Sequence, residues 1–162
     1  MSSAVAAVGL AQLKSFLRDH GVSFDVIAHP RSETAAAEAR AAQLPQEQTA
    51  KTVVLHTSAG YRFAVIAASD RLDLHKAADA LGVRRHDVRL ATEADMGADF
   101  SRYEVGAIPP IGPDTPLELV DLRLLDYSHV LCPAGDHEHS LLVDPMDIVR
   151  VTGARSVDVR ED

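Results

Sequence analysis

The sequence lacks the features of a secreted or membrane protein. Its one cysteine, Cys132, has no second cysteine with which to form an internal disulfide, which suits a reducing cytoplasm. No apolar run approaches the roughly 20 residues that a membrane-spanning helix needs. The first residues also lack the basic segment followed by an apolar stretch that marks a secretory signal. We therefore expect a cytoplasmic protein that does not enter a membrane.

The chain also has fewer basic residues than acidic ones. The chain has 16 lysines and arginines against 24 aspartates and glutamates, which gives a formal net charge of −8. This balance weighs against a protein that binds long stretches of nucleic acid by neutralising phosphates. A site that takes only the end of a nucleic acid is still compatible with it.

Several common catalytic motifs are missing. The chain has no G-x-G-x-x-G and no G-x-x-x-x-G-K-[ST], so the usual nucleotide-binding loops are absent. It has no G-x-S-x-G nucleophile elbow, no C-x-x-C and no H-E-x-x-H. Catalysis, if present, would therefore depend on backbone N–H groups and one or two side chains.

What the chain does have is a regular alternation of helical and strand patterns. With 162 residues, 46% of them hydrophobic, it can form one domain, spanning 1–162, with a substantial core. Apolar spacing and capping residues predict helices that end near residues 20, 42, 82 and 153, and a helical turn from residue 92. Strands are predicted at 24–28, 51–57, 61–67, 88–90, 117–121, 129–132, 140–143 and 156–159. We expect the 51–67 hairpin at the centre of a mixed, not doubly wound, sheet.

The most distinctive segment is GAIPPIG at residues 106–112, which we call the Gly–Pro loop. Pro109 and Pro110 have fixed φ and no backbone N–H, so the segment can be neither a helix nor a central strand. It predicts a stiff loop with a hydrophobic wall. The N–H groups near Gly106 and Ala107 could stabilise a developing negative charge. The plainer alternative is a rigid surface turn.

Four short motifs follow one another along the chain, with the predicted hairpin among them. They are His29-Pro30 with Thr34-Ala35, Lys51-Thr52-Val53-Val54, the Gly–Pro loop and Ala134-Gly135. In this order and spacing they resemble the YbaK/EbsC family, whose members are free-standing relatives of the editing domain of prolyl-tRNA synthetase. The resemblance runs from about Leu13 to Val157.

The resemblance implies a fold, an activity and a partner. The fold would be an α/β (α+β) domain with a mixed, largely antiparallel and curled sheet surrounded by helices. The activity would be hydrolysis of the ester that joins a wrong amino acid, such as alanine, cysteine or serine, to tRNA, with no metal or organic cofactor. We expect contact mainly with the tRNA acceptor end and weak affinity for tRNA alone, so that an aminoacyl-tRNA synthetase or another tRNA-binding protein could assist.

The resemblance also implies site residues. Lys51 matches the family's lysine and would meet a phosphate or carbonyl at the tRNA 3′ end. Gly106 and Ala107 would donate to the ester oxyanion, and His139 would position the substrate or act as a base. The pocket is expected between the Lys51 strand and the Gly–Pro loop, where Ile111 replaces a frequent phenylalanine and changes the expected pocket shape. The expected substrate-binding residues are Thr34, Ile108, Pro109, Pro110, Gly112 and Gly135.

Several of these residues also have a purely structural alternative. Lys51 can be a strand-end lysine with its ammonium group in water. Thr34 can be a helix N-cap, and His139 a solvated histidine in an exposed turn. We expect no covalent nucleophile, because no serine or cysteine has a base at a recognisable spacing.

Two other functions stay open. The first is a non-catalytic module on the same fold that binds an aminoacyl or nucleotide group. The second is a metal-dependent hydrolase that uses His129, Cys132, His137 and His139. Their spacing is not that of a zinc ribbon, so we expect no metal site. The sequence does not indicate an oligomeric state.

Overall fold

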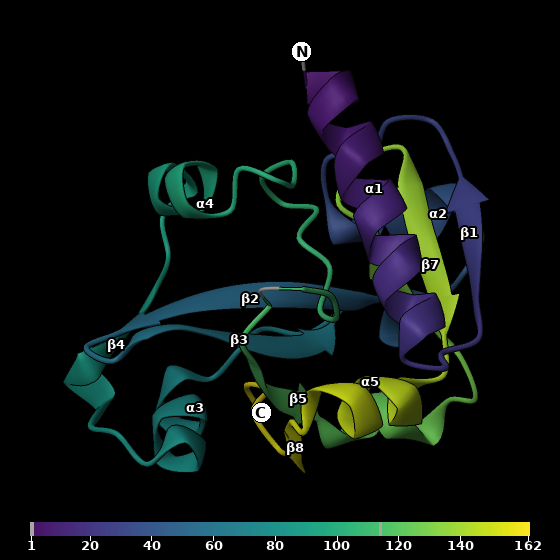
Figure 1. Cartoon of the computed structure of the whole chain (residues 1–162). Coiled ribbons are helices and arrows are strands. Elements are labelled where there is room, and N and C mark those ends of the chain that lie inside the picture. Colours follow the sequence, from purple (N-terminus) through teal and green to yellow (C-terminus); the bar gives the residue numbers. More distant parts are fainter. Residues whose placement is uncertain (1, 114) are drawn as a thin grey trace.

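The computed structural model describes residues 2–113 and 115–162, and forms a mixed α/β domain (Figure 1). Its helices are α1 (Ser2–Asp19), α2 (Ala35–Ala41), α3 (Leu74–Leu81), α4 (Glu93–Asp99) and α5 (Pro145–Thr152), with 3₁₀ turns at Gln46–Gln48, Arg85–Asp87 and Leu122–Asp126. Its strands are β1 (Phe24–Ala28), β2 (Ala50–Thr57), β3 (Gly60–Ala67), β4 (Val88–Leu90), β5 (Leu117–Asp121), β6 (Val130–Pro133), β7 (His139–Val143) and β8 (Arg155–Val157). The predicted helices and strands are confirmed, with small differences at their ends.

The strands divide into two sheets. Five strands pair in the order β4-β2-β3-β5-β8, and three pair in the order β1-β7-β6. The pairs β3–β5 and β5–β8 are parallel and the other strand pairs are antiparallel, so the prediction of a mixed, largely antiparallel sheet is confirmed. The β2–β3 hairpin lies inside the larger sheet, as predicted. An isolated bridge between Thr49 and Leu131 links the two sheets at the start of β2.

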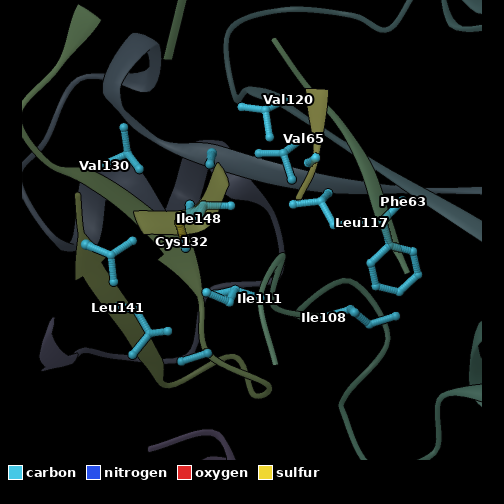
Figure 2. Close-up of a cluster of buried hydrophobic side chains, with 14 of the residues drawn as sticks. Phe63, Val65, Ile108, Ile111, Leu117, Val120, Val130, Cys132, Leu141 and Ile148 are labelled. Carbon is cyan, nitrogen blue, oxygen red and sulfur yellow. The ribbon is translucent and has the colours of Figure 1, made fainter. Parts of the chain in front are cut away.

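The main core lies between the two sheets. Figure 2 shows Ile111 of the Gly–Pro loop among side chains from both, with Cys132 and Leu141 on one side and Val65 on the other. Leu13 and Leu17 of α1 join the same cluster, because they lie one turn apart on one helix face. Burial of each such side chain contributes about 1.5–3 kcal/mol to folding.

A second core lies on the other face of the larger sheet. There Ala77 and Ala78 of α3 pack on Leu55, Ala64 and Ile66, and Figure 1 shows α3 against this sheet. Small alanines let the helix approach the strands closely. Within the described residues, no helix is both long and apolar enough to span a membrane.

The helix ends follow their capping residues. Thr34 caps α2 by accepting a hydrogen bond from Ala37 N–H (3.1 Å), and Thr92 and Asp95 form a capping box on α4. Gly82 and Gly153 end α3 and α5 in the left-handed conformation. Thr34 therefore has the predicted capping role, which fixes the segment that enters α2.

Candidate functional site

The Gly–Pro loop is buried, so the alternative of a rigid surface turn is wrong. Residues 107–112 are buried, while Gly106 is exposed at the start of the loop. Ile108 and Ile111 are only 3% and 0% exposed, and they anchor the loop in the main core (Figure 2). The two prolines between them prevent strand pairing, and the two isoleucines hold the backbone in place. The buried apolar part of the loop thus holds the exposed Gly106 in a fixed position.

Gly106 itself requires glycine. Its φ is +86°, and a Cβ there would lie 3.4 Å from Cε1 of His137. An alanine would have to adopt an unfavourable backbone conformation and press on the histidine ring. The loop backbone therefore runs directly against the turn that carries His137.

Backbone hydrogen bonds connect the turn between β6 and β7 to the Gly–Pro loop and the residues just before it. The N–H of Glu104 donates to the carbonyl of Gly135 (2.9 Å), and the N–H of Gly135 donates to the carbonyl of Ala107 (2.8 Å). Gly135 has φ +101°, and a Cβ there would meet the Tyr103 ring at 2.9 Å. The structure thus brings together Gly106, Ala107 and Gly135, which are predicted to belong to one site.

The two predicted N–H donors, those of Gly106 and Ala107, differ in whether they are already hydrogen-bonded. Ala107 N–H donates to the Glu104 carbonyl (3.0 Å), so it is not free and does not match the expected oxyanion donor. The reason is local: a tight turn over residues 104–107 uses this N–H to close itself. No hydrogen bond among the described residues uses the N–H of Gly106. Gly106 is therefore the available donor.

A small inner pocket opens beside Gly106. Its lining residues are His29, Ser32, Thr34, Glu38, Gly106, Ala107, Pro133, Asp136 and His137. The volume is about 10 Å³, which is about what a single water molecule needs. Next to it, and sharing His137, lies an open groove of about 440 Å³. The groove is lined by Arg31, Glu33, Glu93, Glu104, Val105 and His137.

His137 connects the two sides of the pocket. Its side chain is 6% exposed, with Nδ1 2.9 Å from the Ser32 carbonyl and Nε2 2.8 Å from the Val105 carbonyl. Carbonyl oxygens only accept hydrogen bonds, so both contacts are hydrogen bonds only when both ring nitrogens carry protons. Its backbone N–H also donates to the Glu104 carboxylate (2.9 Å). Sequence reasoning considered His137 only as a metal ligand.

The inner wall of the pocket contains a buried carboxyl group. Glu38 of α2 is 7% exposed, and Oε2 accepts a hydrogen bond from the Ser140 hydroxyl of β7. The Ser140 Oγ lies 2.8 Å from Nε2 of His29. Burial raises the pKa of Glu38 to about 7, although the Ser140 hydrogen bond opposes this rise.

Sequence reasoning missed this group of three. Ser140 lies 102 positions from Glu38 and 111 positions from His29 in the chain, and no local motif predicts these contacts. The one available signal was an acidic residue on the inner face of an alanine-rich helix. Ser140 does have a histidine beside it, but the serine is fully buried, so it is poorly placed to be a nucleophile.

Comparison with known proteins shows the family of the chain. Residues 29–151 match the family model described as aminoacyl-tRNA editing domain. The chain belongs to this family. No protein with a curated description matches the sequence significantly.

Three solved structures resemble this editing domain over almost its whole length. A candidate trans-editing enzyme for prolyl-tRNA synthetase has 26% identity and a TM-score of 0.83, covering 95% of this chain and 98% of its own. A structure from work on computational epitope grafting onto scaffold proteins has 26% identity and a TM-score of 0.82, covering 95% and 97%. A hypothetical protein has 25% identity and a TM-score of 0.82, covering 91% and 98%.

His139 of this editing domain is oriented by a carboxylate. Its Nδ1 lies 2.9 and 3.0 Å from the two carboxylate oxygens of Asp136. Asp136 is buried and lines the inner pocket, whereas the His139 side chain is 32% exposed and does not. The expectation of an exposed turn is therefore wrong for Asp136 and Ser140, which are buried, and His137 between them is buried as well.

Lys51 lies elsewhere in the editing domain. Ala50 and Val54 belong to the core that holds Ile111, whereas alternation along β2 places Lys51 on the opposite face. Its Nζ lies 3.5 Å from the Ala68 carbonyl, and partial burial lowers its pKa. The expected pocket between the Lys51 strand and the Gly–Pro loop is thus wrong, because residues of β2 line neither the inner pocket nor the groove.

The four residues of the metal alternative do not form a metal site. Among the described residues, no group of three or more His, Cys, Asp or Glu side chains is placed to hold a metal ion. His137 and His139 face the partners given above, and His129 lies beside the hydroxyl of Ser128. Cys132 is fully buried, and burial raises the pKa of its thiol. These contacts leave the metal-dependent hydrolase without support.

Proposed function

We propose that the protein hydrolyses the ester bond of mischarged aminoacyl-tRNA. The observation that carries the proposal is the unbonded N–H of Gly106 at the edge of a water-sized pocket. An ester carbonyl placed against this N–H would have a donor for the charge that develops on its oxygen. A water molecule in the pocket would lie next to the same carbonyl.

The chemistry needs little else from the protein. An aminoacyl ester is already activated, and the neighbouring ribose hydroxyl of the substrate could assist the attack. The buried position of Ser140 argues against a covalent intermediate, so water is the nucleophile in this proposal. The rigid backbone of the Gly–Pro loop would hold the donor in place before the substrate arrives.

The open groove suits the aminoacyl end of the substrate. Three carboxylates and one arginine line it, and an aminoacyl ester carries a positively charged α-ammonium group. We propose a small amino acid such as alanine, cysteine or serine, with Thr34 lining the inner pocket beside it. The other predicted binding residues are buried behind the pocket and would act by supporting it: Ile108, Pro109, Pro110, Gly112 and Gly135. His139 would contact or orient the substrate from outside the inner pocket.

The rest of the tRNA would be held weakly. A net charge of −8 opposes broad contact with phosphates, so the acceptor end would make most of the interaction. Lys51 would bind a phosphate near the 3′ end, and a synthetase or another tRNA-binding protein could supply the remaining affinity. We place the activity in the cytoplasm, where tRNA is charged.

The test is amino acid release from a panel of mischarged tRNAs. Gly106→Ala keeps the N–H but should displace it, because the φ of +86° disfavours alanine and the added Cβ would press on His137 at 3.4 Å. The rate is expected to fall about 100-fold, as when an oxyanion donor is lost. Gly97→Ala in α4 is the matched control, since Gly97 has no positive φ and its added Cβ would meet only Val105 at 3.9 Å. Release from no member of the panel by a folded protein would contradict the proposal.

One observation favours a second candidate. The inner pocket of about 10 Å³ is too small for an aminoacyl side chain without rearrangement. A non-catalytic module that binds an aminoacyl or nucleotide group in the groove would need no such opening. Saturable binding of a non-hydrolysable aminoacyl-adenosine amide, without release from any mischarged tRNA, would identify that function.

A further inference from the structure

Two polar side chains that line the pocket are joined in a row by a third that is buried behind them. Glu38 comes from α2, Ser140 from β7, and His29 from the segment that follows β1. Ser140 lies between the other two, with its hydroxyl hydrogen-bonded to Glu38 Oε2 and its Oγ 2.8 Å from His29 Nε2. Glu38 and His29 both line the pocket, and Ser140 is fully buried.

The hydrogen-bond geometry of this row is compatible with one shared proton at either end. Nδ1 of His29 lies 2.8 Å from the Pro30 carbonyl, which only accepts, so Nδ1 carries a proton. If Nε2 is also protonated, it donates to Ser140, and Ser140 donates to an ionised Glu38. If Nε2 is bare, a protonated Glu38 donates to Ser140, and Ser140 donates to Nε2. Every hydrogen bond is satisfied in both arrangements.

The surroundings of Glu38 set how readily it exchanges this proton. Burial raises its pKa to about 7, and the Ser140 hydrogen bond favours the ionised form. The other titratable groups around it are Asp136 and His137 of the pocket and the buried thiol of Cys132. A carboxyl group that titrates near neutral pH can both accept and return a proton under physiological conditions.

One oxygen of Glu38 remains available to a ligand. Oε2 contacts Ser140, whereas Oε1 has no hydrogen-bond partner in the described part of the chain. The same pocket is lined by Gly106, whose N–H is also unbonded. Glu38 and Gly106 therefore border one water-sized space.

We propose that Glu38 is the general acid–base residue of this pocket, and that Ser140 and His29 position it. The inference rests on the proposed deacylase function. The water oxygen bonds to the ester carbonyl carbon while Glu38 takes one of the water protons. The bond from that carbon to the ribose oxygen then breaks, and Glu38 gives the proton to the ribose oxygen. The products are the free amino acid and tRNA with its hydroxyl restored.

The first test compares Glu38→Gln with wild type on a tRNA that wild type deacylates. Glutamine keeps the shape and the contact with Ser140 but cannot take up the proton, so the rate is expected to fall at least 100-fold. Binding of a non-hydrolysable aminoacyl-adenosine amide should be retained. Glu47→Gln is the matched control, because Glu47 is exposed and does not line the inner pocket.

The second test uses the pH dependence of the rate in Ser140→Ala, corrected for spontaneous hydrolysis. Wild type should gain activity as pH rises through about 7, where Glu38 becomes ionised. Removing the hydroxyl that favours the ionised form should move this midpoint to higher pH. A purely structural role for Ser140 would lower the rate at every pH and leave the midpoint unchanged, which would overturn the positioning role.

The outcomes separate this inference from the proposed function. An active wild type with an equally active Glu38→Gln variant would overturn the role of Glu38 and leave the deacylase proposal intact. A wild type that releases no amino acid from any tRNA would overturn both. Should Glu38→Gln fail to fold, the midpoint shift in Ser140→Ala still decides the matter.

Discussion

The two walls of the inner pocket are built in different ways. The Gly–Pro loop contributes backbone, held in place by Ile108 and Ile111 in the core. The opposite wall contributes side chains, with Glu38, Ser140 and His29 joined by hydrogen bonds. The first wall gains its rigidity from apolar packing, and the second from hydrogen bonds between polar side chains. Because their stabilities have different origins, they should respond to different perturbations.

The largest effect on stability should come from the apolar wall. Ile111→Ala removes a fully buried side chain from beneath the loop, and such changes cost about 2–5 kcal/mol. The free energy of unfolding, measured with urea, should fall by this amount. Leu90→Ala, at a 53% exposed position, is the control and should change stability little. Equal losses in both variants would show that the loop is not held by Ile111.

A somewhat smaller effect on the free energy of unfolding should appear when Glu38 of the polar wall is titrated. The folded protein raises the pKa of Glu38 from 4.5 to about 7, so the neutral form is favoured on folding. The resulting stabilisation is complete below about pH 4 and is lost as pH rises through 7, by up to about 3 kcal/mol. In Glu38→Gln this part of the pH dependence should disappear. An identical pH profile of stability in both proteins would contradict the assignment.

The smallest effect is expected on tRNA binding when Lys51, which lies outside both walls, is replaced. If it binds a phosphate of the tRNA end, Lys51→Ala should weaken tRNA binding roughly 2–5-fold, as expected for one charge contact near the surface. The rate at saturating tRNA should stay close to that of wild type. Lys14→Ala on α1 is the control. A large loss of rate at saturation would instead place Lys51 next to the ester.

The same contrast explains what could be predicted from the sequence. The Gly–Pro loop, the caps at Thr34 and Thr92 and the β2–β3 hairpin depend on local residue types, so their patterns are visible in the chain. The family resemblance predicts that Gly106 and Gly135 belong to one site, and the structure places their segments side by side.

Contacts between distant segments could not be predicted in this way. The division into two sheets depends on which strands pair, and periodicity alone does not determine pairing. The Glu38–Ser140–His29 row forms only when α2, β7 and the end of β1 meet. The face on which Lys51 lies follows from strand register, and the turn that uses the Ala107 N–H follows from backbone geometry.

The most direct measurement is NMR of the protein with a non-hydrolysable aminoacyl-adenosine amide. The account predicts that the amide signal of Gly106 and the side-chain carboxyl signal of Glu38 shift together as the ligand saturates, while signals around Asp70, near Lys51, change little. Shifts confined to the Lys51 end, with Gly106 and Glu38 unchanged, would contradict the claim that the two walls form one substrate site.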